Sequence, residues 1–303
     1  MTNWNALETG LAAASLRAAT PLLWALLGET LDQRAGIVNL GLEGQMLVGA
    51  ATAFGVTASS GSPWLGLGAG ALAGAALAAL HAVLCVRYRA NQFVSGISVW
   101  MVGFGVSSYL GQKLVGQSIE GFSDGSASAL GRAFPLFGAL TPPTLLAVAL
   151  ALVTGAFLYR TRPGLAVRAV GESRACAAAA GVRVNVVQTL SVLVGGLFSG
   201  AGGAVLSIDY AQTWAEGMTQ GRGLVAVGLV IVARWNPYLA LPTAVVFGGA
   251  ETLVLRLQAA GSEASAHLLH MLPYGAALGV LVVSCLRRSA GNAPAELRTV
   301  LER

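Results

Sequence analysis

Charged residues are scarce in this chain. Only 10% of its 303 residues are Asp, Glu, Lys or Arg, whereas a soluble domain carries about 25%. Hydrophobic residues make up 55% of the sequence, and the mean hydropathy is +0.70. This composition excludes an ordinary water-soluble domain and indicates a membrane protein that crosses the lipid several times. The net charge of +5 is explained by the placement of loops on one side of the membrane, so we expect no nucleic-acid partner.

Lysine and cysteine are also rare. The single lysine, Lys113, follows Gln112, so the chain lacks the Gly-Lys-Ser/Thr of a phosphate-binding loop. We therefore expect that the chain is not an enzyme and binds no cofactor of its own. The cysteines at 85, 176 and 285 show no CxxC pair and no metal-ligand spacing, so we predict no metal site.

Long apolar segments fill most of the sequence. Each is close to the length of about 20 residues that crosses a bilayer as a helix. We predict an all-α polytopic membrane protein with roughly 8–10 transmembrane or re-entrant helices, because lipid offers the backbone no other partner. The expected domains are a single transmembrane domain, 1–288, and a cytoplasmic tail, 289–303. The apolar segments lie at 11–31, 41–59, 64–86, 93–112, 143–160, 187–207, 238–257 and 268–286, with a shorter one at 224–233.

Arginine placement predicts the orientation of these helices, since cytoplasmic loops are enriched in basic residues. Arg87 and Arg89 place one turn inside, and the loop 160–185 carries five arginines and one acid. The loop 113–142 and the N-terminus are then outside. We expect Tyr210 and Trp214 to be anchors at the outer membrane interface.

The basic loop 161–185 has the pattern of two short helices. Pro163 can begin a helix, and Gly181 suits a helix end. We expect Gly171 to interrupt the helix and Glu172-Ser173 to open the second one. Such a construction favours a docking element for a cytoplasmic partner, although a solvated connector that only sets the topology explains the charges as well.

Polar residues interrupt the apolar sequence at 34–45, which reads RAGIVNLGLEGQ. Its three glycines permit an irregular backbone, and Asn39, Glu43 and Gln45 bring polar groups to the same bend. Irregular backbone at membrane depth is tolerated only where protein buries it or where it lines a cavity. We identify these three residues as candidates for a substrate path. The alternative is structural: Glu43 accepts hydrogen bonds from free backbone N–H groups and fixes the turn.

Two further positions are candidates for the same path. Asn91 and Gln92 begin an apolar segment and could contact the hydroxyls or bases of a cargo, or could cap a helix. Arg222, between two glycines, begins the short segment that ends at Asn236-Pro237. Such a segment is typical of the broken helices in transporters, but an ordinary helical hairpin has the same pattern.

Several of these motifs together resemble the permease subunits of bacterial ABC importers for nucleosides and simple sugars. The chain is similar to the shorter permease of the purine-nucleoside branch, and the resemblance extends over about residues 11–288. The matching segments are LRAATPLL (16–23), RAGIVNLGLEGQM (34–46), NQFVSGI (91–97), RAVGES (168–173), AAGV (179–182), GRG (221–223) and RWNP (234–237).

The resemblance implies an ATP-driven importer in the bacterial plasma membrane that works by alternating access. Its implied partners are a second homologous permease, a cytoplasmic ATPase that binds ATP and Mg²⁺, an extracytoplasmic substrate-binding lipoprotein and a small-molecule substrate, with membrane lipid around it. The residues implied in ATPase coupling are Arg168, Gly171, Glu172, Ser173 and Gly181. A gradient-driven transporter or channel is the alternative, with Glu43, Asp209 or Glu251 as an ion site.

Overall fold

The computed structural model describes residues 4–123, 139–260, 269, 271–286 and 293–297. This described part contains helices and no named strand, which confirms the predicted all-α class. The helices are α1 (Trp4–Arg34), α2 (Leu42–Ser60), α3 (Pro63–Ala82), α4 (Gln92–Gly111), α7 (Pro142–Arg160), α8 (Arg162–Glu172), α9 (Arg174–Ala179), α10 (Val184–Val205), α11 (Arg222–Val232), α12 (Pro237–Ala259) and α14 (Leu272–Leu286).

Each predicted apolar segment corresponds to one of these helices. Within the described residues, six helices are long and apolar enough to cross a membrane: α1, α3, α4, α7, α10 and α12. Short π-helical turns extend α3 to Arg87 and α10 to Tyr210. The central helix α2 has Glu43 in its first turn, and α11 is a short apolar helix. The segments predicted at 41–59 and 224–233 therefore form α2 and α11, which are not among these six helices.

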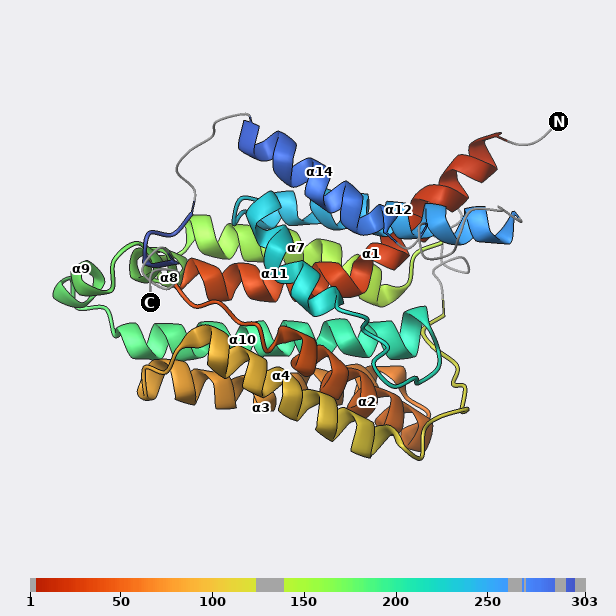
Figure 1. Ribbon diagram of the computed structural model, residues 1–303, viewed down its shortest axis with the longest axis horizontal. Helices are drawn as coiled ribbons and strands as arrows, with labels where there is room; N and C mark the ends of the chain where they lie inside the picture. Colours follow the sequence, from red (N-terminus) through yellow and green to blue (C-terminus); the bar gives the residue numbers. More distant parts are fainter. Residues whose placement is uncertain (1–3, 124–138, 261–268, 270, 287–292, 298–303) are drawn as a thin grey trace.

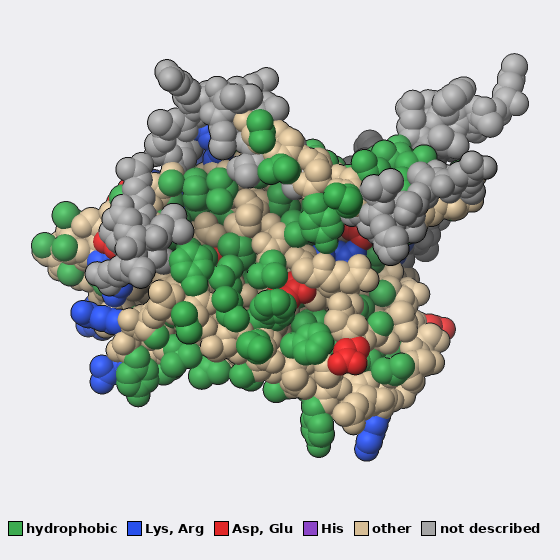
Figure 2. All heavy atoms as spheres, viewed as in Figure 1, with side chains coloured by type: hydrophobic (Ala, Val, Ile, Leu, Met, Phe, Trp, Pro, Cys, Tyr) green, Lys and Arg blue, Asp and Glu red, His purple; other side chains and the backbone are tan. Residues whose placement is uncertain are grey.

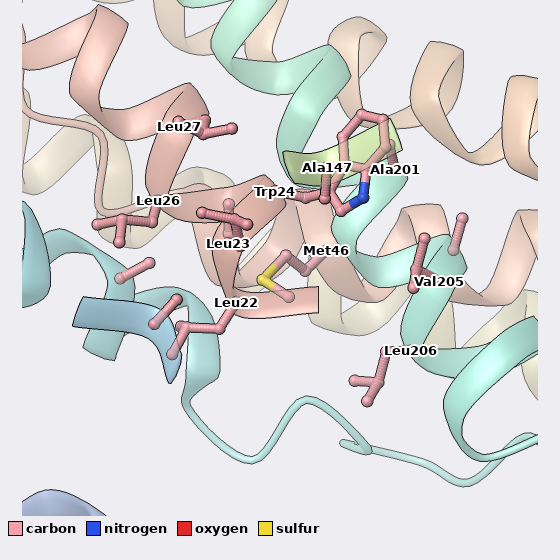
Figure 3. Close-up of a cluster of buried hydrophobic side chains, with 14 of the residues drawn as sticks. Leu22, Leu23, Trp24, Leu26, Leu27, Met46, Ala147, Ala201, Val205 and Leu206 are labelled. Atoms are coloured by element: carbon pink, nitrogen blue, oxygen red, sulfur yellow. The ribbon is translucent and has the colours of Figure 1, made fainter. Parts of the chain in front are cut away.

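The long helices lie side by side, with α8 and α9 together at one end of the molecule (Figure 1). The helix α2 packs against α3, α4 and α10, and most of its residues are buried. A cluster of buried apolar side chains from α1, α2 and α10 occupies this centre (Figure 3). Leu22, Leu26, Met46 and Leu206 are at most 2% exposed within it. In lipid, such close packing stabilises the bundle mainly through van der Waals contact.

Small residues allow α3 to approach two neighbours at once. Gly66, Gly70, Gly74 and Ala78 lie on one helical face and are all buried. A Cβ atom on Gly70 would collide with α2 at the carbonyl oxygen of Gly49, and a Cβ on Gly74 would collide with α10. This face of α3 is therefore a packing surface, because helix backbones come this close only where the side chains are small or absent.

Basic side chains are unevenly distributed between the two ends of the bundle (Figure 2). Lys and Arg side chains gather mainly at the end where α8 and α9 lie (Figure 2). Arg34, at the end of α1, donates to the carbonyl oxygen of Trp235 at 2.7 Å, so α1 and the segment after α11 end at the same level. Trp214 was predicted to anchor the outer interface, and this is wrong. It is 2% exposed, because its indole ring packs against Gly111 at the end of α4.

Candidate functional site

The helix α2 begins inside the bundle. The chain leaves α1 at Arg34 and runs without regular structure through residues 35–41. Leu40 lies against Gly96, and Gly41 lies against Val99. Val99 is seven residues into α4, which corresponds to about 10 Å along a helix. The segment 35–41 is therefore an irregular bend at depth.

Side chains from the surrounding helices satisfy the backbone of this bend. The N–H of Val38 donates to the Gln92 side chain at 2.8 Å, and the Val38 carbonyl oxygen lies 3.3 Å from Nε2 of His81. Gln188 of α10 donates to the carbonyl oxygen of Ala35 at 2.9 Å. These partners replace the hydrogen bonds that lipid cannot supply.

Asn39 is the centre of a buried polar network. Its side-chain amide donates to Asp32 Oδ2 at 3.2 Å and to Gln45 Oε1 at 3.3 Å. Its side-chain oxygen accepts from Gln45 Nε2 at 3.3 Å and from the Gly41 N–H at 3.1 Å. Asn39, Asp32 and Gln45 are 0% exposed. The network holds the end of α1, the bend and the start of α2 in one arrangement.

Two carboxyl groups of this network, Glu29 and Asp32, were not predicted from the sequence. Both are 0% exposed, and they are three residues apart on α1, which places them on the same face. Glu29 accepts from the Asn39 N–H at 3.2 Å and from Gln33 at 2.8 Å. The signal was present, because an acidic residue within an apolar span is a functional candidate by default. Glu29 lies within the apolar segment 11–31 and Asp32 directly follows it, so neither acid was selected as a candidate.

Glu43 joins the start of α2 to the start of α11. Its Oε1 accepts from the hydroxyl of Thr219 at 2.5 Å and from the N–H of Gly221 at 2.8 Å, and its Oε2 accepts from the N–H of Gly223 at 2.6 Å. A carboxylate is favourable at a helix N-terminus, where unpaired N–H groups and the helix dipole are positive. Glu43 lies in the first turn of α2, and its carboxylate satisfies N–H groups at the start of α11.

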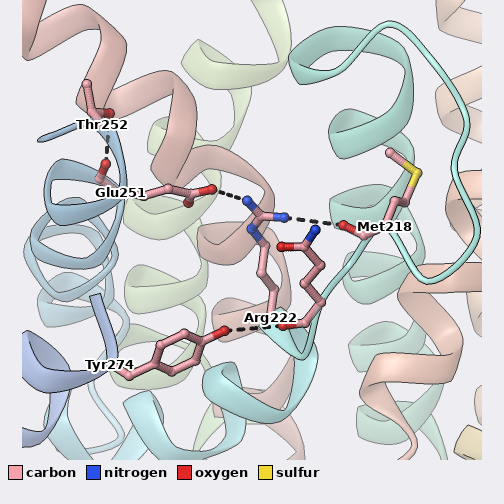
Figure 4. Close-up of polar contacts among 7 residues, drawn as sticks. Met218, Arg222, Glu251, Thr252 and Tyr274 are labelled. Atoms are coloured by element: carbon pink, nitrogen blue, oxygen red, sulfur yellow. Dashed lines mark hydrogen bonds and ion pairs between the residues drawn. The ribbon is translucent and has the colours of Figure 1, made fainter. Parts of the chain in front are cut away.

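Arg222 lies at the first position of α11 and forms an ion pair with Glu251 of α12 (Figure 4). Its guanidinium also donates to the carbonyl oxygen of Met218 at 3.4 Å. Beside the pair, the Tyr274 hydroxyl donates to the carbonyl oxygen of Gln220 at 3.2 Å. The Arg222 and Glu251 side chains are 12% and 20% exposed, so both are partly accessible.

The structure thus brings four of the six candidate path residues to the bend. Asn39, Glu43 and Gln45 are buried in it, and Gln92 contacts its backbone. Asn91 is separate from them: it is exposed, and its side-chain oxygen caps α4 by accepting from Phe93 N at 3.0 Å and Val94 N at 3.2 Å.

The two short helices predicted for the basic loop are confirmed as α8 and α9. The Thr161 hydroxyl caps α8 at the N–H of Gly164, 3.1 Å away, and the Ser173 hydroxyl caps α9 at the N–H of Cys176, 3.2 Å away. Gly181, with φ +83°, follows the end of α9, as predicted. Gly171 does not interrupt the helix, because α8 continues to Glu172, and Ser173 separates the two helices.

Gly171 instead allows α8 to contact the bend. A Cβ atom at this position would collide with the carbonyl oxygen of Arg34. Nearby, the Arg168 guanidinium lies 5.4 Å from the centre of the Tyr159 ring. From the tail, Glu296 accepts from the N–H of Arg174 at 2.8 Å and lies beside Gly36. The helix α8 is therefore in direct contact with the segment that positions Asn39.

Metal chemistry has no support in the described residues, which contain no group of three His, Cys, Asp or Glu side chains able to hold an ion. The site offers amides, carboxylates and one arginine, arranged to hold short helix ends at depth. Donors and acceptors of this kind can hydrogen-bond a polar solute.

Comparison with known proteins identifies the group to which this chain is similar. The family described as the branched-chain amino acid transport system permease component matches residues 11–281. This match includes the bend, α8, α9 and α11. No solved structure matches the chain.

Three relatives match this chain over most of their own length and most of its length. The putative glucose ABC transporter permease TsgC13 of Haloferax volcanii is 44% identical over 82% of this chain and 78% of its own. The guanosine ABC transporter permease NupQ of Bacillus subtilis is 32% identical over 79% and 80%. The nucleoside ABC transporter permease NupC of Lactococcus lactis is 31% identical over 84% and 86%.

Proposed function

Because this chain belongs to the branched-chain amino acid transport system permease family, we propose that it carries a nucleoside or a simple sugar across the plasma membrane. It is an ABC transporter permease with several membrane-spanning helices. A permease moves its cargo without chemical change, so the chain is not an enzyme. It acts with an ATPase and a substrate-binding partner.

The relatives define the class of cargo that we propose. Their names state glucose, guanosine and nucleosides, which are neutral solutes rich in hydroxyl groups. Amides and hydroxyls can replace the water around such a solute because they both donate and accept hydrogen bonds. We propose a purine nucleoside as the first cargo to test and glucose as the second.

The contact between α8 and the bend carries our proposal for the mechanism. Gly171 of α8 lies directly on the backbone of Arg34. In the bend that follows, Asn39 hydrogen-bonds to Gln45 of α2, and Glu43 of α2 holds the start of α11. Movement of α8 by the ATPase would therefore reach the start of both helices. We propose that this movement alternates the path between outward and inward access, with Arg168, Gly171, Glu172, Ser173 and Gly181 as the coupling residues.

Each candidate path residue has a distinct place in this proposal. Asn39 and Gln45 hydrogen-bond to each other, and Gln92 accepts from the Val38 N–H of the bend. We propose that they contact the cargo in a different conformation, in which these hydrogen bonds are released. Arg222 is partly accessible here, and we place it beside the path with Glu251. Asn91 lies at the cytoplasmic end of α4, where an inward-moving cargo would leave.

The partner assembly is part of the same proposal. We propose that ATP and Mg²⁺ bind to the ATPase alone and that a second homologous permease completes the path. An extracytoplasmic lipoprotein would deliver the solute. The gradient-driven alternative is not favoured by the family, and its candidate acids have partners: Glu251 is paired with Arg222, and Asp209 accepts from Thr141 at 2.7 Å.

Uptake in cells that carry the complete transporter tests the proposal. Labelled guanosine, adenosine, cytidine, glucose and ribose are supplied one at a time to cells with the wild-type permease and to cells without it. We expect permease-dependent uptake of a nucleoside or a sugar that ends when the ATPase is inactivated by mutation. Uptake that continues without ATP hydrolysis, and stops when the ion gradient is removed, would instead support a gradient-driven transporter.

A further inference from the structure

An apolar groove opens between α7 and α10 in the half of the molecule nearest α8. Its volume is about 350 Å³, within the range of about 300–1,000 Å³ that is typical of ligand sites. Leu31 of α1 and Phe198 of α10 line it, and Pro163 and Val167 of α8 close its cytoplasmic end. Its only polar lining residues are Thr154 and Ser191, both buried.

The rim of the groove faces outward from the bundle. Val153 of α7 is 60% exposed, and Leu190 of α10 is 55% exposed. Both helices are long and apolar enough to cross a membrane, so this rim lies within the depth of the bilayer. An occupant must therefore be apolar and must reach the groove from the hydrocarbon region.

The cytoplasmic ends of the groove walls are basic. Arg160 ends α7, Arg162 begins α8 and Arg183 precedes α10, and all three are exposed. The sequence contains no acidic residue from 139 to 171 or from 173 to 208, so Glu172 is the one acid that these helices contribute at this end. Basic residues between helices at the cytoplasmic surface attract anionic lipid head groups.

We propose that this groove binds an anionic phospholipid of the cytoplasmic leaflet. One acyl chain fills the groove, and the phosphate lies at the cytoplasmic end beside Arg160, Arg162 and Arg183. The apolar lining alone fits the chain of any lipid, whereas the three arginines favour a head group with net negative charge.

The site connects lipid composition to the coupling helices. Pro163, Ala166 and Val167 line the groove and belong to α8, which contacts the bend through Gly171. A bound acyl chain would fill the space beneath α8 and hold it against the bundle. Anionic lipid should therefore increase the ATPase activity that depends on substrate delivery, in addition to binding.

Photocrosslinking in nanodiscs tests the site on the assembled transporter. The probes are phosphatidylglycerol and phosphatidylcholine with the same diazirine-labelled acyl chain, and peptides with attached lipid are identified by mass spectrometry. We expect the anionic probe to label 153–157 and 187–194 at least threefold more than the zwitterionic probe. Replacing the three arginines together (Arg160→Gln, Arg162→Gln and Arg183→Gln) should reduce labelling by phosphatidylglycerol to the level of phosphatidylcholine.

A matched control uses Arg87→Gln with Arg89→Gln, which removes two arginines from the turn after α3, away from the groove walls. This control should keep the preference for phosphatidylglycerol. Equal labelling by the two probes in the wild-type transporter would overturn the proposal. It would also be overturned if both probes labelled other parts of the transporter and left 153–157 and 187–194 unlabelled. The wild-type comparison needs no variant, so poor folding of the triple variant leaves the test intact.

Discussion

Glu43 shows how one side chain can connect the starts of two helices, α2 and α11. Its carboxylate accepts three hydrogen bonds, from Thr219, Gly221 and Gly223, and it is 3% exposed. The sequence left open whether Glu43 contacts cargo or fixes the turn. These contacts occupy the carboxylate in the present conformation, so we expect the effect of its removal to appear first in stability.

Replacing Glu43 with Gln tests this expectation. The amide keeps one acceptor oxygen, but its NH2 group would face the N–H of either Gly221 or Gly223, and the negative charge at the start of α11 is removed. We expect a loss of about 1–3 kcal/mol in stability and a clear loss of uptake. Thermal unfolding of the purified permease and uptake in cells are the measurements.

Glu216→Gln is the matched control for Glu43→Gln. Glu216 is exposed and accepts from the Ser108 hydroxyl at 2.7 Å, so its replacement should change neither measurement. Unchanged stability in Glu43→Gln would show that the three hydrogen bonds do not hold α11 in place.

Asn91 can be tested separately, because its capping oxygen and its amide donors are different atoms. Asp keeps the oxygen that accepts from Phe93 N and Val94 N but lacks the donors. We expect Asn91→Ala to lower stability by about 1 kcal/mol and Asn91→Asp to restore both stability and uptake. If Asn91→Asp is stable but transports poorly, the amide contacts the cargo as well.

At the scale of helices, α2 and α10 pack with their backbones in contact. A Cβ atom at Gly203 would collide with the carbonyl oxygen of Met46. We expect Gly203→Ala to destabilise the permease by about 1–3 kcal/mol, because a tightly packed interface cannot accept an added methyl group without shifting. Thermal unfolding in detergent and the amount of protein in the membrane are the measurements.

The control at this scale is Gly228→Ala on α11. Gly228 is exposed, and a Cβ atom there would have no neighbour within 4 Å. The variant should be as stable as the wild type or slightly more stable, since Ala favours the helix over Gly. Equal effects of the two substitutions would mean that helix propensity, and not the contact with α2, determines the result.

A substitution in α8 can test whether this helix couples the permease to the ATPase without affecting folding. Glu172, the last residue of α8, is exposed, so Arg fits there without repacking. We expect Glu172→Arg to reach the membrane normally but to abolish substrate-stimulated ATP hydrolysis by the complex. Glu120→Arg, at an exposed position on the opposite side of the protein, is the control. Normal stimulation in Glu172→Arg would remove this residue from the coupling contact.

For the whole molecule, the orientation in the membrane can be tested with two cysteines. Ser60, at the end of α2, and Tyr88, after the extended α3, are exposed and lie at opposite ends of the bundle. In a background without the native cysteines, an impermeant maleimide should label Ser60→Cys in intact cells and Tyr88→Cys only after the membrane is opened. The reverse pattern would invert the arrangement inferred from the arginines. Ser126, in the predicted outer loop, lies outside the described residues.

The sequence by itself determined the class of protein and the helices, and it predicts the orientation that the two cysteines would test. These properties depend on local composition: lipid requires apolar segments of a fixed length, and the arginines follow the cytoplasmic side. The motifs at 34–46 and 168–173 also placed the chain near its family. Local signals were sufficient at Pro163 and Gly181, because a helix end depends mainly on the residues next to it.

Only the tertiary structure decided which polar groups meet. Glu29 and Asp32 belong to an apolar helix in the sequence, and they become part of the Asn39 network because the bend folds back onto α1. The partner of Glu43 is the start of α11, more than 170 residues away in the chain. Gly171 was expected to break a helix, but its missing side chain allows α8 to approach Arg34. Such contacts join distant segments, so no local pattern contains them.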